Sequence, residues 1–114
     1  MNRYTLLLTF LLSLVSFPSL GIDFEDLVER DGLYYEKFTN TPYSGEVTRR
    51  IVEDDPELLG RVRQFSLKRG MWDGEWLEYD DNGQLRTKGT YKNNYRVGDW
   101  FEYWPNGQVF EKET

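Results

Sequence analysis

The sequence predicts a mostly β domain, built as an antiparallel meander of repeated β-hairpins in a single-layer sheet that follows an N-terminal signal peptide. Three observations lead to this fold class. A twelve-residue segment recurs 24 positions along the chain, and turn signals recur between short aromatic and β-branched runs about every 8–12 residues. The chain has 114 residues, 17% of them aromatic, and no cysteine. This length suits one small domain held together by strand pairing and aromatic burial.

The N-terminal segment, residues 1–21, has the layout of a secretory signal peptide. Arg3 is followed by a long uncharged run that is rich in leucine and closes with small residues. The preferred cleavage site follows Gly21 and leaves residues 22–114 as the mature domain, and cleavage after Ser19 is the alternative. An uncleaved anchor is less favoured, because the apolar core is shorter than the about 20 residues that span a bilayer. We therefore expect a periplasmic or secreted protein with no transmembrane span after cleavage.

Two units, residues 74–97 and 98–112, form the clearest internal repeat. Seven of their first twelve aligned pairs are identical. A weaker copy precedes them and begins near Gly45. Gly45 and Gly74 are 29 residues apart rather than 24, which predicts an insertion at the acidic stretch of residues 53–57. Self-similarity at a fixed period is the signature of a repeat protein.

The tip of each repeated hairpin carries a specific turn chemistry. Pro105 suits the first central position of a type I turn, and the glycine that follows each asparagine supplies the left-handed conformation of a bulge. A separate Asp-Gly pair, Asp31-Gly32, predicts a tight hairpin before the repeats. We expect about eight short strands and no substantial helix after the signal peptide. The predicted turn residues are Asn82, Gly83, Asn106 and Gly107.

Side-chain alternation predicts two aromatic ladders on opposite faces of the sheet. On an extended strand, Trp76 and Glu78 face one side, whereas Leu77 and the next tyrosine face the other. The second unit repeats this alternation with Trp100 and Glu102. In so small a domain, one ladder should form the core and the other should stay partly open.

Five aromatic side chains are the candidate binding residues: Trp76, Tyr79, Trp100, Tyr103 and Trp104. Rigid aromatic side chains dominate interface hot spots, which is why this pattern indicates a binding surface. The competing interpretation assigns them to the hydrophobic ladder of the repeat, and it is favoured for the two tyrosines. Trp104 stands where the other unit has Asp80, so the packing of the repeat does not require an aromatic residue there.

Composition excludes several classes of function. With no His and no Cys, the chain lacks the residues of Ser-His or Cys-His catalysis and of thiol chemistry. The net charge of −6 makes nucleic acid an unexpected partner, since phosphate binding depends on Lys and Arg. Glu78 and Glu102 resemble an acid-base pair for glycan cleavage, but they occupy equivalent repeat positions, which packing explains. We expect a non-enzymatic protein with no cofactor and no metal site.

One full unit resembles the bacterial variant of the MORN repeat, in which a Gly-x-Trp-x-x-Tyr run precedes an Asn-Gly turn and a Lys-Gly-x-Tyr strand. The second unit keeps the front half of this pattern, and the array is expected to stop there. The resemblance implies a MORN-like sheet that contacts proteins or lipids and carries no catalytic residue. Proteins of this kind are often labelled antitoxins of the YwqK type, which neutralise a toxin by binding it. The matching residues are Gly74, Trp76, Tyr79, Asn82, Gly83, Leu85, Lys88, Gly89 and Tyr91.

The leading functional hypothesis is an exported interaction module with an unidentified envelope protein as its partner. An antitoxin or immunity-like binder of a toxin is the specific form of this hypothesis. The alternative is that the aromatic hairpin face binds a glycan, a choline-like cation or lipid head groups. A third hypothesis is strand addition at an open sheet edge, by another copy or by another protein. The surplus of acidic residues would either steer a basic partner or keep edge strands from pairing.

Overall fold

The computed structural model describes residues 21–52 and 56–114. All of the predicted signal peptide except its last residue, Gly21, lies outside these residues. The mostly β fold predicted from the sequence is confirmed. None of the helical structure in the described residues has the length and apolar character needed to cross a membrane. The elements are β1 Gly21–Asp23, the 3-10 turn η2 Phe24–Asp26, β2 Leu27–Arg30, β3 Leu33–Glu36, β4 Gly45–Arg50, β5 Val62–Lys68, β6 Met71–Tyr79, β7 Leu85–Lys92, β8 Tyr95–Tyr103 and β9 Val109–Glu113.

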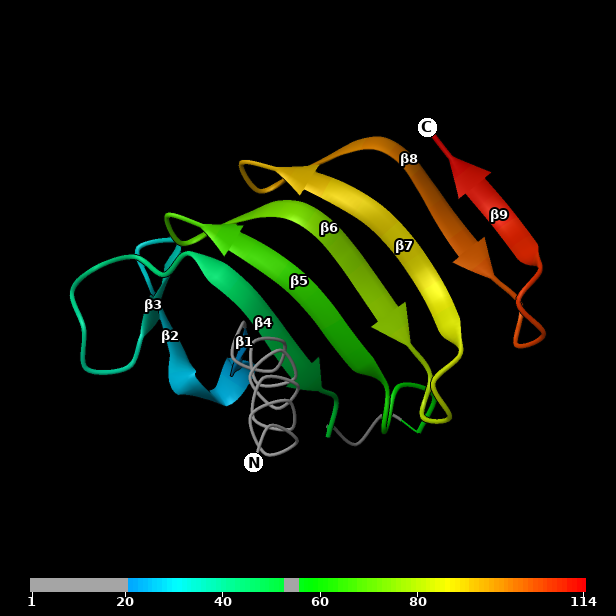
Figure 1. Cartoon of the computed structure of the whole chain (residues 1–114), viewed down its shortest axis with the longest axis horizontal. Coiled ribbons are helices and arrows are strands. Elements are labelled where there is room, and N and C mark those ends of the chain that lie inside the picture. Colours follow the sequence, from blue (N-terminus) through cyan, green and yellow to red (C-terminus); the bar gives the residue numbers. More distant parts are fainter. Residues whose placement is uncertain (1–20, 53–55) are drawn as a thin grey trace, which may run out of the picture.

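Seven of these strands form one curved sheet in the order β1-β4-β5-β6-β7-β8-β9 (Figure 1). From β4 to β9 each strand pairs antiparallel with the next one along the chain, as the meander predicts. The N-terminal elements depart from the meander. Strand β1 pairs parallel with β4, and β2 and β3 form a two-stranded sheet of their own. Strand β9 lies at the outer edge of the large sheet, at the C-terminal end of the molecule (Figure 1).

The 3-10 turn η2 explains why the chain leaves the large sheet after β1. Asp23 caps this turn, and its side chain accepts a hydrogen bond of 2.9 Å from the backbone N–H of Glu25. The redirected chain then forms the β2–β3 hairpin around Asp31 and Gly32, whose φ angles are 53° and 82°. Two consecutive left-handed residues are the geometry of a tight type I′ hairpin.

The repeat seen in the sequence is a repeat of structure. The bounds of strands β6 and β8 differ by the repeat length of 24 residues, and β9 begins 24 residues after the start of β7. The hairpins β6–β7 and β8–β9 are therefore equivalent units. The predicted insertion falls in the connection between β4 and β5, residues 51–61, part of which lies outside the described residues.

The tips of both equivalent hairpins have the same turn geometry. Gly83 and Gly107 each have a φ angle of 91°. The N–H of Gly83 donates to the carbonyl oxygen of Asp80 at 3.0 Å, and that of Gly107 donates to Trp104 at 2.8 Å. The register of each hairpin shifts at the end of its first strand. A type I turn followed by a left-handed glycine in a bulge accounts for all of these features.

We predict that Gly83→Val and Gly107→Val each lower the free energy of unfolding by about 1 kcal/mol or more. An added Cβ at Gly83 would meet no atom within 4 Å, so the cost comes from the left-handed backbone and not from a clash. Urea unfolding monitored by tryptophan fluorescence measures this cost. Gly83→Asn is the matched control, because asparagine tolerates this conformation, and it should cost much less. Equal stability of the valine variants and the wild type would contradict the turn geometry.

The core lies between the N-terminal elements and one face of β4 to β6. Leu27 from β2 packs with Val47 from β4 and with two side chains from β5, Phe65 and Leu67. Val47 is 1% exposed, and Phe24 and Trp72 pack against the same cluster. Beyond β6 the sheet has no such covering layer in the described part of the chain, so β7 to β9 form a single layer that is stabilised by its own side chains.

Candidate functional site

An aromatic ladder crosses one face of the sheet from the core towards β8. The ring of Tyr91 lies 4.8 Å from that of Trp72 and 5.2 Å from that of Trp100. Trp76 lies 5.8 Å from Trp100. Trp100 is 6% exposed, and its indole N–H donates to the carbonyl oxygen of Thr90 at 3.2 Å. A buried ring with its polar atom satisfied is a structural element of the fold.

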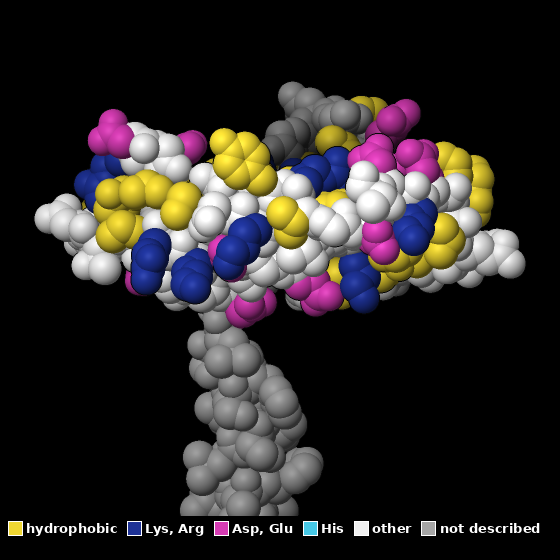
Figure 2. Space-filling view, turned by 90° about the horizontal axis from the view of Figure 1, so that it is seen from above, with side chains coloured by type: hydrophobic (Ala, Val, Ile, Leu, Met, Phe, Trp, Pro, Cys, Tyr) yellow, Lys and Arg dark blue, Asp and Glu magenta, His cyan; other side chains and the backbone are white. Residues whose placement is uncertain are grey.

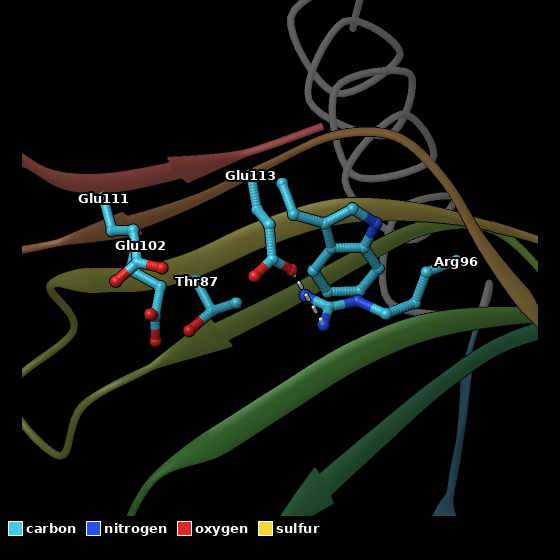
Figure 3. Close-up of a pocket in the computed structure, with 6 residues that line it drawn as sticks. Thr87, Arg96, Glu102, Glu111 and Glu113 are labelled. Atoms are coloured by element: carbon cyan, nitrogen blue, oxygen red, sulfur yellow. Dashed lines mark ion pairs between the residues drawn. The ribbon is translucent and has the colours of Figure 1, made fainter.

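Two arginines of the chain lie over rings of this ladder. The guanidinium carbon of Arg96 is 3.7 Å from the ring centre of Trp100, and that of Arg63 is 5.5 Å from the ring centre of Trp76. Glu113 holds Arg96 in place through an ion pair of 3.6 Å (Figure 3). An external cation would have to displace these arginines to stack on the same rings.

A second, exposed group of apolar side chains lies at the tip of the β8–β9 hairpin. We call it the terminal patch; it comprises Trp104 and Phe110, with exposed fractions of 48% and 49%. The rings of Trp104 and Phe110 contact each other edge to face, with centres 4.3 Å apart. In Figure 2, apolar side chains gather at the end of the molecule where β9 lies, beside several acidic ones. Clustered exposed apolar side chains indicate an interaction surface.

The two equivalent hairpins differ at the positions of this patch, so the repeat itself does not call for aromatic residues there. Trp104 and Phe110 occupy the positions of Asp80 and Arg86 in the preceding hairpin, 24 residues earlier. There, the side chains of Asp80 and Arg86 form an ion pair of 3.7 Å. The same two positions thus hold a polar pair in one unit and an exposed aromatic pair in the next. A pair that the scaffold can replace by an ion pair is available for another role.

A small acidic cavity opens beside Arg96, between β7, β8 and β9 (Figure 3). Its volume is about 140 Å³, and it is bounded by Thr87, Arg96, Trp100, Glu102, Glu111 and Glu113. Among the described residues, neither Glu102 nor Glu111 forms a salt bridge, whereas Glu113 pairs with Arg96. No set of three or more acidic side chains in this part of the chain is close enough to hold a metal ion.

The equivalent position in the preceding unit is neutralised. Glu78 is 5% exposed, and its carboxylate accepts hydrogen bonds from Arg61 at 3.0 Å and from Arg63 at 2.7 Å. Glu102 occupies the same repeat position, but Thr87 stands where Arg63 would be. The two units therefore share a carboxylate and differ in whether the neighbouring strand neutralises it.

A comparison with protein families matches residues 72–93 and 96–114 to the MORN repeat variant. These two segments are similar to MORN repeats, and we refer to the matched hairpins as the MORN units. The matched segments coincide with the hairpins β6–β7 and β8–β9, so the family pattern and the structural units agree. No curated protein and no solved structure gives a significant match.

The structure separates the five predicted aromatic residues into different environments. Trp76 and Trp100 belong to the ladder of the MORN units. Tyr103 is partly buried, and its ring stacks on that of Phe101 at 6.4 Å. Tyr79 is partly buried at the end of β6, and Trp104 lies in the terminal patch.

Sequence reasoning missed Phe110 and the two glutamates of β9. The available signal was the paired change at two repeat positions, Asp80 to Trp104 and Arg86 to Phe110. Alignment of the full MORN units, including their second strands, finds all of these residues.

Two tyrosines near the core have perturbed titration. Burial raises the pKa of Tyr34, and the nearby charge of Glu29 raises it further while Arg49 lowers it. Burial also raises the pKa of Tyr43, whose hydroxyl donates to the carbonyl oxygen of Glu46 at 3.1 Å. Both phenols therefore remain neutral at pH 7 and act as packing and hydrogen-bonding groups.

Proposed function

We propose that this protein is an exported, non-enzymatic interaction module that binds an envelope protein through its last MORN hairpin. The observation that carries the proposal is the replacement of the Asp80–Arg86 ion pair by the exposed contact between Trp104 and Phe110. Exposed aromatic side chains on a rigid hairpin lose little conformational freedom on binding, and they are enriched at interface hot spots. The repeat architecture supplies the rigid hairpin.

The proposal also includes export of the protein and, in its most specific form, a toxin as the partner. Residues 1–21 have the layout of a signal peptide, which supports a periplasmic or secreted location. N-terminal sequencing of the exported chain should find a start at position 22, or at position 20 for the alternative cleavage site. An antitoxin or immunity-like role means that the terminal patch covers a surface that the toxin needs for its activity.

Binding of a choline-like cation or a glycan by the ladder has less support. Arg96 and Arg63 already lie over Trp100 and Trp76, and Trp100 is buried. Two arginines beside the central insertion, where a lipid head group could contact a cation, are engaged within the chain as well. Arg61 and Arg63 both bind Glu78. These contacts favour a protein partner at the terminal patch over a small ligand at the ladder.

The test is capture of the partner by the tagged protein in its native envelope, followed by quantitative mass spectrometry. The decisive variant combines Trp104→Asp with Phe110→Arg, because it installs the ion pair that the preceding MORN unit already tolerates. We expect this variant to keep its circular dichroism spectrum and to lose the dominant partner at least tenfold, as for a hot-spot pair worth about 1.4 kcal/mol or more.

The control is Phe38→Asn, which removes a fully exposed aromatic side chain in the connection between β3 and β4. This variant should retain the partner. Equal recovery of the partner with the wild type and the double variant would contradict binding through the terminal patch.

A further inference from the structure

We propose that the outer edge of β9 accepts an extended basic segment of the partner as an additional strand, with its Lys or Arg side chains on the side of Glu102, Glu111 and Glu113. This inference rests on the proposed function, since it assigns to the partner a segment that reaches the same hairpin. It specifies the chemistry of that segment and the way in which it binds.

The edge of β9 is open in the described part of the chain. Strand β9 pairs with β8 alone, and all five of its residues are exposed. The backbone N–H and C=O groups on the outer side of such a strand are a template for a further strand. Figure 1 shows β9 as the last strand of the curved sheet, with no segment beyond it.

The charge pattern beside this edge is complementary to a basic strand. In the preceding MORN unit, Arg63 on the neighbouring strand β5 and Arg61 just before that strand neutralise Glu78. At the equivalent Glu102 the neighbouring strand offers Thr87, and β9 adds Glu111 directly opposite Glu102. In Figure 3 the carboxylates of Glu102 and Glu111 lie near each other and away from the ion pair between Arg96 and Glu113. Arg96 is thus engaged, and the carboxylates of Glu102 and Glu111 form no salt bridge with any described residue.

The alternation of side chains along β9 determines which residue pattern the added segment must have. Glu111 and Glu113 lie on one face of β9, while Phe110 and Lys112 lie on the other. Lys112 is held near Asp99 at 3.4 Å, which leaves Phe110 as the apolar side chain of that face. A fitting segment therefore alternates Lys or Arg with apolar residues, so that cations meet the glutamates and apolar side chains meet Phe110.

The same charges select against pairing with a second copy. If two β9 edges paired antiparallel, rows of glutamate would face each other across the new ladder, and like charges opposite one another are destabilising. Among the described residues, no group of three or more acidic side chains could hold a metal ion. Cationic side chains spaced two residues apart along an added strand match the spacing of Glu111 and Glu113 on β9.

The test uses a fluorescein-labelled seven-residue peptide of alternating Lys and Val, with anisotropy as the readout. The decisive protein variant combines Glu102→Gln, Glu111→Gln and Glu113→Gln. Its control combines Glu25→Gln, Glu29→Gln and Glu36→Gln, which changes the net charge equally at exposed sites in the N-terminal elements, away from β9. We expect the first variant to bind about tenfold more weakly than the wild type, and the control to bind within twofold of it. Equal weakening by both variants would overturn the site, because the peptide would then sense net charge alone.

A second peptide distinguishes strand addition from electrostatic contact. It has the same sequence, but alternate backbone amides are N-methylated, so that it cannot pair as a strand. It should bind at least tenfold more weakly, and the unmodified peptide should slow hydrogen exchange of the β9 amides. Equal binding of the two peptides would overturn strand addition.

The two proposals fail in different ways. No peptide binding, together with loss of the partner in the Trp104→Asp, Phe110→Arg variant, would overturn strand addition and leave the proposed function standing. Peptide binding with the partner retained by that variant would overturn the terminal patch as the binding surface.

Discussion

Gly89→Ala is expected to lower the free energy of unfolding by about 3 kcal/mol, because it overpacks a filled site in the sheet. A Cβ at Gly89 would clash with carbon atoms of the indole ring of Trp100, closer than real Cβ atoms approach any neighbour. The ring cannot move aside cheaply, because its N–H is bonded to the carbonyl oxygen of Thr90 and Arg96 lies over it. Relief of the clash would break the ladder between two MORN units.

Two comparisons isolate the clash in urea unfolding experiments. Gly83→Ala changes a left-handed glycine in open space and should cost about 1 kcal/mol. Gly89→Ala should cost little in a Trp100→Ala background, because the ring that it meets is gone. A cost for Gly89→Ala no larger than that for Gly83→Ala would show that Trp100 does not lie over Gly89.

Glu78→Gln is expected to destabilise the protein by about 2 kcal/mol. The carboxylate is buried and binds two guanidinium groups, so its loss leaves Arg61 and Arg63 facing each other without a counter-charge. This value is smaller than the about 3–5 kcal/mol of a fully buried pair, because the arginine side chains are 23% and 26% exposed.

The matched control for Glu78→Gln is Glu102→Gln, the same change at the equivalent position of the next MORN unit. Glu102 is exposed and has no salt bridge to a described residue, so its replacement should change stability by less than about 0.5 kcal/mol. Thermal melts of the two variants side by side measure the contrast. Equal costs at both positions would contradict the difference in neutralisation on which the basic-strand proposal depends.

The repeated part of the fold was predictable from the sequence because local signals and the repeat agree. Alternation correctly placed Trp76 and Trp100 on one face, where their rings contact each other. The parallel pairing of β1 with β4 was not predictable in this way. Strand β1 has three residues, and its partner is chosen by packing of Phe24 on the core and not by a turn signal.

The candidate site was only partly predictable, since its residues were singled out by type and not by environment. Trp100 carries the same aromatic signal as Trp104, yet one is buried over Gly89 and the other is exposed. Exposure depends on which strands lie next to a residue, and this is a tertiary property. Whether the carboxylate of Glu102 is neutralised likewise depends on the residues that the neighbouring strand places beside it. The sequence of one strand alone does not contain that information.

The measurement that most directly tests the terminal patch is site-specific crosslinking in the native envelope. A photo-crosslinking phenylalanine analogue is placed at position 110 in one protein and at position 86, its repeat equivalent, in another. Binding through the last MORN hairpin predicts one dominant protein adduct from position 110 and none from position 86. The same adduct from both positions, or from position 86 alone, would contradict the central claim that the exchanged pair Trp104 and Phe110 forms the binding surface.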